Sequence, residues 1–276
     1  MATPNASPPE TSKGSGLPIQ TLYMLVSLVA SIVVVDLFYR VVVKPKVEGI
    51  ALLKESGELD PTETSVWIIL RDFEQQACIT LFLWATALIV YKWWETGRER
   101  RLLKRGLLEL GEADAIAANR ATSLVTSIRE KLKPSEQRGI LPRALFRGLS
   151  RFRKGSNVEE VSSSINNHCE GELGRMESEL SMINYIAWAI PSVGFIGTVR
   201  GIGGALAVAG TALGDDITQV TDKLGVAFNS TLIALLLSIP LMLFIHHIRQ
   251  RQESTISEIE DYCQDNLVAR LYRSPT

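Results

Sequence analysis

The chain contains 276 residues, of which 46% are hydrophobic, and carries a formal net charge of -1 at pH 7. Its mean hydropathy of +0.13 is high for one water-soluble domain of this length, so the composition points to several membrane spans. The three cysteines, Cys78, Cys169 and Cys263, are odd in number and widely separated. They lack the spacing of a metal site or a disulfide framework, so we expect free thiols in a reducing or membrane environment.

Four segments are apolar and long enough to cross a bilayer, whose hydrocarbon core of about 30 Å requires roughly 20 helical residues. They cover residues 21–43, 77–94, 182–213 and 224–248, and a polar tail of residues 1–20 precedes them. The first segment has a longer apolar core than a signal peptide and no small-residue cleavage site, so we expect it to remain as a span. The prediction is an all-α integral membrane protein with four transmembrane helices.

The distribution of lysine and arginine predicts how these spans are oriented. Residues 95–181, between the second and third spans, contain 16 Lys and Arg residues, which by the positive-inside rule face the cytoplasm. The connections on the other side, residues 44–76 and the short loop 214–223, are acidic. We therefore expect a multi-pass protein with both termini in the cytoplasm, including a charged C-terminal helix over residues 249–276.

The segments outside the membrane have the pattern of helix extensions. Asp60–Glu63 combines an N-cap aspartate, a proline at the first helical position and an early glutamate, which predicts a helix that starts there and runs through the second span. Leucines at helical spacing extend this helix to about Leu110. A second helix-start signature at Ser156–Val161 predicts a long helix that enters the membrane from the cytoplasm.

A basic segment, Arg143–Gly155, lies between these long helices. Its apolar residues fall on one side, at Leu145, Phe146, Leu149 and Phe152. We favour an amphipathic helix that lies on the helical bundle or on the inner headgroups. The alternative is that residues 143–154 form a docking surface for a cytoplasmic partner.

Spans three and four each carry a face of small residues. In span three, glycines recur every three or four residues around Thr198, at Gly194, Gly197, Gly201 and Gly204. In span four the matching positions are Ala227, Thr231, Ala234 and Ser238, with Asn229 and Ser230 beside them. Such faces let helix backbones approach closely in membranes. Two interpretations stay open: the two helices pack very tightly, or they line a narrow polar path around another component.

Two charged residues inside spans need an explanation. Arg200 would cost roughly 2.5–3.5 kcal/mol at a helix centre. Residues 182–213 would however form a helix about 48 Å long, so Arg200 can reach an interface. We favour snorkelling or an intersubunit salt bridge over a direct part in ion entry or partner contact. Asp36 lies one turn before Arg40, which favours a local ion pair.

Two stretches of these spans carry a family resemblance. PSVGFIGTVRGI, Pro191–Ile202, resembles the signature P-x-x-G-L-x-G-T-V-x-G-I/M of the MotA/TolQ/ExbB proton-channel family. NSTLIALLLSIP, Asn229–Pro240, is similar to the second signature of that family. Ala234 stands where that signature has a glycine, and Val226 stands where some members have an acidic residue.

The resemblance implies a bacterial inner-membrane machine. Family members form homopentamers around a dimer of a small single-span partner of the ExbD/TolR/MotB kind, whose transmembrane aspartate carries H⁺ or Na⁺. At the matching positions, Thr198 and Thr231 are implied to be pore-facing hydroxyls that contact this aspartate or its ion. Ser230, Asn229 and Ser238 accompany them, and Pro191 and Pro240 mark bends. The load that is driven does not follow from the resemblance.

Other classes of function have less support. No nucleophile with a base, phosphate loop, carboxylate pair or metal-ligand cluster stands out, so we expect neither an enzyme, a cofactor nor a nucleic-acid partner. Two alternatives to the motor remain. One is a passive helical scaffold in the membrane, and the other is a signalling protein that uses the basic segment 143–154.

Overall fold

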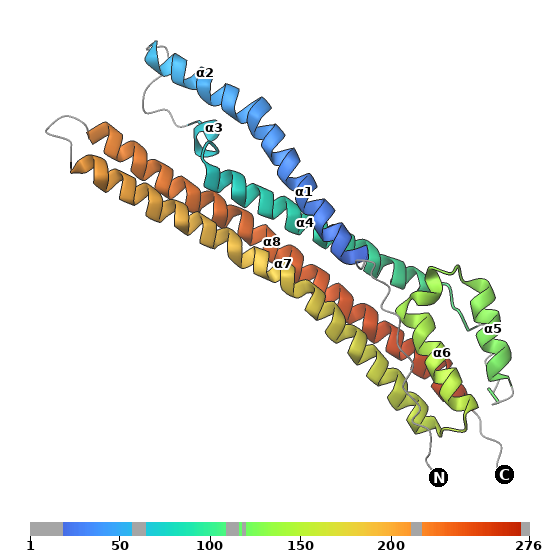
Figure 1. The fold of residues 1–276 in the computed structure, drawn as a ribbon. Helices are drawn as coiled ribbons and strands as arrows, with labels where there is room; N and C mark the ends of the chain where they lie inside the picture. Colours follow the sequence, from blue (N-terminus) through green and yellow to red (C-terminus); the bar gives the residue numbers. More distant parts are fainter. Residues whose placement is uncertain (1–18, 57–64, 109–115, 118–119, 211–216, 272–276) are drawn as a thin grey trace, which may run out of the picture.

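The computed structural model describes residues 19–56, 65–108, 116–117, 120–210 and 217–271. In these residues the chain is helical, with one isolated parallel bridge between Ile116 and Leu271 and no sheet. The predicted all-α class is therefore confirmed. Figure 1 shows an elongated bundle with two smaller helices gathered at one end.

The helices follow the chain in simple order. Helix α1 (Ile19–Phe38) continues through a π-helical turn (Tyr39–Val43) into α2 (Lys44–Glu55). The short α3 (Val66–Ile69) precedes α4 (Phe73–Lys104), and α5 (Ala121–Lys131) and α6 (Ile140–Arg153) follow. The two longest helices are α7 (Val158–Ala209) and α8 (Ile217–Asn266). Turns of 3₁₀-helix cover Glu136–Arg138 and Val268–Arg270.

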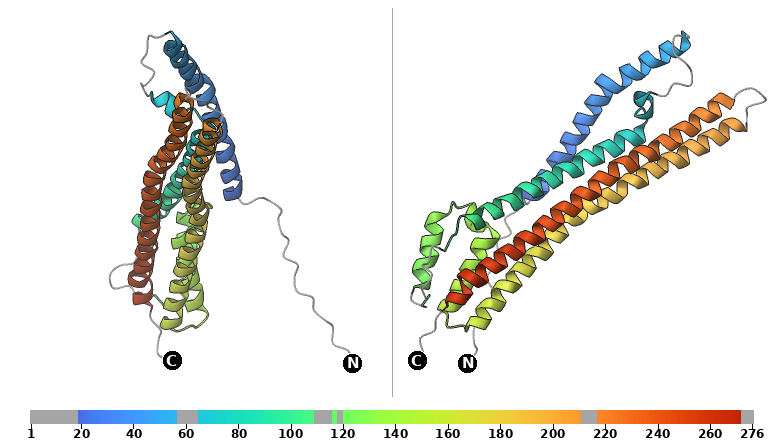
Figure 2. Two further views of the ribbon diagram at one scale, coloured as in Figure 1. Left: turned by 90° about the vertical axis from the view of Figure 1, so that its left-hand side faces the viewer. Right: turned by 180° about the vertical axis from the view of Figure 1, so that it is seen from behind.

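Helices α7 and α8 form a long hairpin that organises the rest (Figure 1). Asn157 caps α7, because its side-chain oxygen accepts a hydrogen bond from the Glu160 N–H at 2.7 Å, as the start signature predicts. Each helix continues through an internal proline, Pro191 in α7 and Pro240 in α8. Helix α4 packs against both, and α1 packs on α4 and leans away from the hairpin (Figure 2).

Four helical stretches are long and apolar enough to cross a membrane, which confirms the predicted number of spans. They are Thr21–Leu53, Phe73–Lys104, Val158–Ala209 and Gln219–Arg270. Each extends beyond the predicted span, and the 52 residues of α7 would measure about 78 Å, more than twice a hydrocarbon core. The Nε atom of Arg40 lies 2.7 Å from Asp36 Oδ2, as predicted for this local ion pair.

Two ion pairs between α4 and α7 bracket the apolar part of the bundle. Lys92 Nζ lies 2.5 Å from Glu179 Oε2 and 2.8 Å from Glu95 Oε2, and Arg200 Nη2 lies 2.8 Å from Glu74 Oε2. Glu74 and Glu95 on α4, and Glu179 and Arg200 on α7, are both 21 positions apart. This spacing is about 31 Å of helix, the thickness of a hydrocarbon core. We call this zone the apolar layer.

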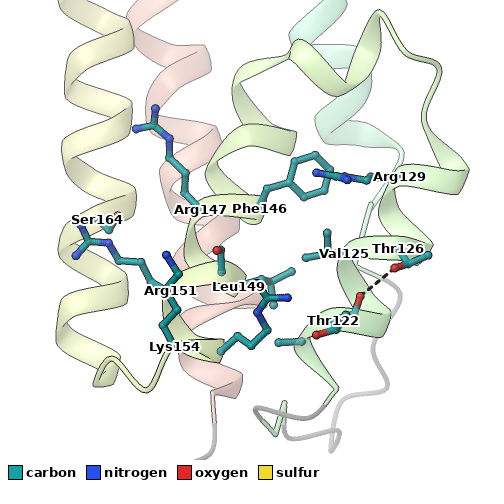
Figure 3. Close-up of a pocket in the computed structure, with 13 residues that line it drawn as sticks. Thr122, Val125, Thr126, Arg129, Phe146, Arg147, Leu149, Arg151, Lys154 and Ser164 are labelled. Atoms are coloured by element: carbon teal, nitrogen blue, oxygen red, sulfur yellow. Dashed lines mark hydrogen bonds between the residues drawn. The ribbon is translucent and has the colours of Figure 1, made fainter. Parts of the chain in front are cut away.

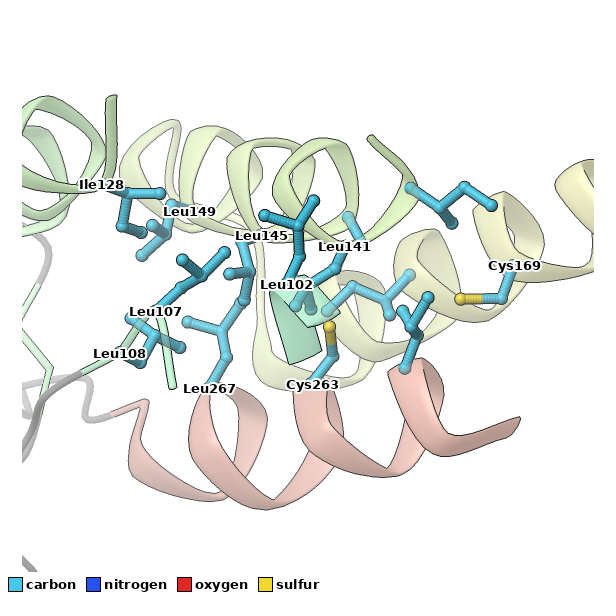
Figure 4. Close-up of a cluster of buried hydrophobic side chains, with 14 of the residues drawn as sticks. Leu102, Leu107, Leu108, Ile128, Leu141, Leu145, Leu149, Cys169, Cys263 and Leu267 are labelled. Atoms are coloured by element: carbon cyan, nitrogen blue, oxygen red, sulfur yellow. The ribbon is translucent and has the colours of Figure 1, made fainter. Parts of the chain in front are cut away.

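Beyond the Lys92 pair, the bundle has a second core of the kind found in water-soluble proteins (Figure 4). We call this part, with α5 and α6, the basic end. Its buried residues come from α4, α6, α7, α8 and the adjoining turns, and include Leu102, Leu107, Leu108, Leu141, Leu145, Leu149, Cys169, Cys263 and Leu267. Each buried leucine contributes about 1.5–3 kcal/mol.

Helix α6 lies along the bundle and not across the headgroup plane. Its start is tied to α4, since the Ile140 N–H donates to Glu99 Oε2 at 3.0 Å. Further along, Gly148 lets α6 approach closely, because a Cβ there would lie 2.8 Å from Leu267 Cδ2. Of the two positions predicted for the amphipathic helix, the structure has the one on the bundle.

Two predicted boundaries of the second span's helix are wrong. The uninterrupted helix expected from Asp60 is broken at residues 70–72, where Asp72 is extended with φ -85° and ψ 161°, and α4 begins at Phe73. The proposed start at 60–63 lies outside the described residues. The helix also ends at Lys104 and not near Leu110. Gly106, with φ +59°, turns the chain so that Leu107 and Leu108 can enter the second core.

Candidate functional site

The small-residue faces of α7 and α8 meet each other within one chain. A Cβ on Gly201 would lie 2.6 Å from Ala227 Cβ and 2.8 Å from Ala227 Cα. A Cβ on Gly194 would overlap Ala234 Cβ. The two backbones can only approach this closely because these positions are glycine, which supports the tight-packing interpretation.

Not every residue predicted for these faces takes part. A Cβ on Gly204 would find only Lys223 Cδ within 4 Å, at 3.8 Å. Ser238 is buried and donates to Leu235 O of its own helix at 3.0 Å. Asn229 is half-buried, and within the described residues no hydrogen bond joins it to Thr198 or Thr231. These three predicted positions therefore lie outside the close contact.

Three hydroxyls meet at this contact, and we call Thr198, Ser230 and Thr231 the hydroxyl cluster. The hydroxyls of Thr198 and Thr231 are hydrogen-bonded to each other. The carbonyl of Gly194 lies 3.2 Å from both Ser230 Oγ and Thr231 Oγ1 and 3.3 Å from Thr198 Oγ1. Ala227 O lies 2.8 Å from Ser230 Oγ and 3.1 Å from Thr198 Oγ1. The structure thus brings together three residues that the sequence singled out.

The hydrogen-bond geometry limits what the cluster can do chemically. Each hydroxyl has one proton to donate and two lone pairs that accept. The carbonyls of Gly194 and Ala227 are within reach of all three protons, so the lone pairs stay available. In this state the cluster is suited to accept a hydrogen bond from a protonated acid or a hydrated proton. It can donate to a carboxylate only when a hydroxyl releases a backbone carbonyl.

A carboxylate lies beside this cluster that we did not anticipate from the sequence. Glu74 of α4 is 5% exposed, and a Cβ on Gly197 would lie 3.1 Å from Glu74 Cγ and overlap the Ser230 side chain. The expectation that no acid of this chain approaches the Thr198 and Thr231 faces is therefore wrong. The only signal in the sequence is an acid at the start of one apolar span and a base in another.

Glu74 also explains Arg200. The 2.8 Å contact between Arg200 Nη2 and Glu74 Oε2 is an ion pair within the chain and not between subunits. The Arg200 side chain is 59% exposed, whereas that of Glu74 is 7% exposed. Arg200 lies two positions after Thr198, about 3 Å further along the axis, so the hydroxyl cluster lies near this edge of the apolar layer.

Comparison with known proteins bears on the same helices. Residues 136–261 match the model of the MotA/TolQ/ExbB proton channel family. The match includes α6, nearly all of α7 and the greater part of α8, with both stretches that carry the resemblance. A search among curated proteins found no match. The resemblance seen in the two motifs is confirmed.

Proposed function

Because residues 136–261 belong to the MotA/TolQ/ExbB proton channel family, we propose that this chain is a channel-forming subunit of an ion-driven motor. The observation that carries the proposal is the hydroxyl cluster, which joins the two helices that contain the family motifs. The cluster lies inside the apolar layer and adds polar acceptors there without adding a fixed charge.

The proposed motor needs an acid from another protein. Glu74 is bound in an ion pair with Arg200, so its charge is already compensated within the chain. The ion-carrying carboxylate is proposed to be the transmembrane aspartate of a small single-span partner, present in two copies within a pentamer of this chain. Each unit charge that crosses 100 mV releases about 2.3 kcal/mol, which is enough to bias a mechanical step.

The proposal includes an orientation and a chemical class. The basic end faces the cytoplasm of a bacterium, with the protein in the inner membrane, because positive residues are retained on that side. The transported ion is H⁺ or Na⁺. The chain is proposed to act without a cofactor and without catalysing a covalent reaction.

Ion flux into vesicles tests this proposal. The chain is reconstituted together with the proteins that co-purify from its host membrane, and flux is followed with an ion-sensitive dye under an imposed potential. We expect Thr198→Val and Thr231→Val to lower flux about tenfold, since each loses a hydrogen bond to a charged group worth roughly 1.5–3 kcal/mol. Thr198→Ser keeps the hydroxyl and serves as the control, with near wild-type flux.

The same experiment separates the motor from the passive scaffold. Valine has nearly the shape of threonine, so the oligomer observed in native mass spectrometry should not change. Wild-type flux in both valine variants, with assembly intact, would assign the hydroxyls to packing and favour the scaffold.

A further inference from the structure

A groove between α4 and α8 lies at the edge of the apolar layer, next to the basic end. Its cavity of about 480 Å³ is lined by two tryptophans and four cations, namely Trp93, Trp94, Arg100, Arg101, Lys104 and Arg251. We call it the interfacial groove. We propose that it binds the headgroup of an anionic phospholipid of the leaflet on that side.

The depth of the groove matches a bilayer surface on both helices. Trp93 and Trp94 follow directly after Lys92, whose ion pair with Glu179 closes the apolar layer on α4 and α7. On α8, Arg251 comes three positions after the end of the predicted span at Ile248. Tryptophans at this depth are typical of the membrane-water interface. A headgroup of the adjoining leaflet would therefore lie at the level of the groove.

The groove has an excess of positive charge. Its one carboxylate, Glu258, is hydrogen-bonded to Arg100 and also accepts from Ser254 Oγ at 2.9 Å. Within the described residues, no carboxylate lies at ion-pair distance from Arg101, Lys104 or Arg251. Three cations thus remain to compensate a phosphate, and basic pockets between helices on the cytoplasmic side bind anionic headgroups.

Arg251 is held in place before any ligand arrives. Its guanidinium carbon lies 4.1 Å from the centroid of the Trp93 ring, and Nη2 would lie 3.5 Å from a Cβ on Gly97. The Nε atom of Arg251 is buried and has no hydrogen-bond partner. A side chain fixed in this way loses little conformational entropy on binding.

Exposed apolar residues continue from the groove into the apolar layer. Val90 lies one turn before Trp94 on the same face of α4, and the two are 62% and 73% exposed. Phe244 lies two turns before Arg251 on α8 and is 41% exposed. The acyl chains of a lipid can lie along these side chains while its phosphate occupies the groove, which a soluble anion would not use.

A second basic groove provides a contrast. It lies between α5, α6 and α7, has a cavity of about 750 Å³, and presents Arg147, Arg151 and Lys154 (Figure 3). Ser164, which also lines it, lies 15 positions before Glu179, about 22 Å along α7 from the apolar layer. The headgroup region is only about 5–8 Å deep on each side. Charge is similar in the two grooves, but only the interfacial groove is within reach of lipid.

Lipid retention measured by native mass spectrometry tests the proposal. The full chain, with its co-purifying proteins, is delipidated in mild detergent and titrated with phosphatidylglycerol or phosphatidylcholine of identical acyl chains. We expect preferential retention of phosphatidylglycerol. Arg251→Gln and Lys104→Gln should each lower it about fivefold, the effect of about 1 kcal/mol per basic residue. Retention of phosphatidylcholine should not change.

Matched variants make the result specific. Arg249→Gln removes the same charge at nearly the same depth on another face of α8, and Arg151→Gln removes one from the second groove. Both should retain phosphatidylglycerol like the wild type. Lys104 is exposed at the end of α4, so Lys104→Gln keeps the test valid even if Arg251→Gln fails to fold.

Three outcomes would overturn the proposal. The first is equal retention of the two lipids by the wild type, and the second is undiminished phosphatidylglycerol binding in Lys104→Gln. The third is displacement of the lipid by millimolar glycerol phosphate, which would make the occupant a soluble anion. None of these outcomes bears on ion flux, so the lipid site and the proposed motor function fail independently.

Discussion

Glu74 and Arg200 place an ion pair beside the hydroxyl cluster, at one edge of the apolar layer. The two partners differ in their access to solvent, since the Glu74 side chain is 7% exposed and that of Arg200 is 59% exposed. An arginine with this exposure can be solvated without its partner, whereas a buried carboxylate cannot. The pair therefore chiefly neutralises Glu74 where α4, α7 and α8 meet.

Removal of either partner should have unequal effects on stability. We expect Arg200→Gln to destabilise the fold by about 2 kcal/mol, because Glu74 stays buried without its counter-ion. Glu74→Gln should have a much smaller effect, and the double variant should recover most of the loss. Denaturant unfolding in detergent measures all three. Equal losses in the two single variants would show that Glu74 has another way to be neutralised.

At the scale of elements, the contact of α7 with α8 depends on which glycines face the partner helix. Gly201 has Ala227 directly against it, whereas a Cβ on Gly203 would meet nothing within 4 Å. Both positions lie in the same stretch of α7, so differences in helix propensity between them are small. The faces of small residues therefore build one chain's hairpin, and this contact is complete before any oligomer forms.

Substitution by leucine at these two glycines should separate packing from propensity. Gly201→Leu should force α7 and α8 apart, with a loss of about 1–3 kcal/mol or more from overpacking. Gly203→Leu should unfold near the wild-type midpoint. The melting curves and the elution profiles of the two variants check this. A normal midpoint for Gly201→Leu would contradict the close contact that the structure describes.

The second core, at the basic end, also controls thiol chemistry. Cys169 on α7 and Cys263 on α8 are both 0% exposed in this core, and burial raises the pKa of the Cys169 thiol to about 11. Burial raises the pKa of Cys263 as well. Since the thiolate is the reactive form, these groups should be inert at neutral pH.

Thiol titration provides the corresponding test. At pH 8 the folded protein should not react with a thiol reagent on the minute timescale, and all three free cysteines should react after denaturation. Because burial raises the pKa, the thiols favour the folded state below the unfolded pKa of about 8.5, and this contribution is lost as pH rises through the folded value near 11. Rapid labelling of the folded protein would indicate that the core opens readily.

At the scale of the whole molecule, α7 and α8 connect two different environments. In the apolar layer their outer faces expose large apolar side chains such as Phe195, Ile196 and Leu236, which suit contact with lipid or other subunits. At the basic end the same helices are covered by α6 around the second core. A movement of the hairpin in the membrane would thus be transmitted rigidly to the basic end.

Native mass spectrometry of the complex extracted from its host membrane tests the proposed assembly. We expect five copies of the 30.5-kDa chain together with two copies of a small single-span protein that carries a transmembrane acid. The expectation follows from the family match and from the exposed apolar faces of α7 and α8. A monomer or dimer that persists in several mild detergents, without such a companion, would count against the motor.

The sequence by itself determined the class of the protein, its four spans and the residues of the hydroxyl cluster. These features depend on apolar run length and on spacing along one helix, which are local properties. Gly204, Asn229 and Ser238 share that local pattern, and only the packing of α8 against α7 excludes them from the contact.

Only the tertiary structure decided which distant residues meet. Glu74 and Arg200 are 126 positions apart, and no periodicity indicates that they face each other across α4 and α7. The interfacial groove likewise exists only because Trp93 and Arg251 come from helices that lie side by side. The end of α4 was also misjudged from leucine spacing, since Leu107 and Leu108 are apolar for a core that forms after the chain turns at Gly106. Spacing predicts that a residue is buried, but the packing of neighbouring helices determines its partners.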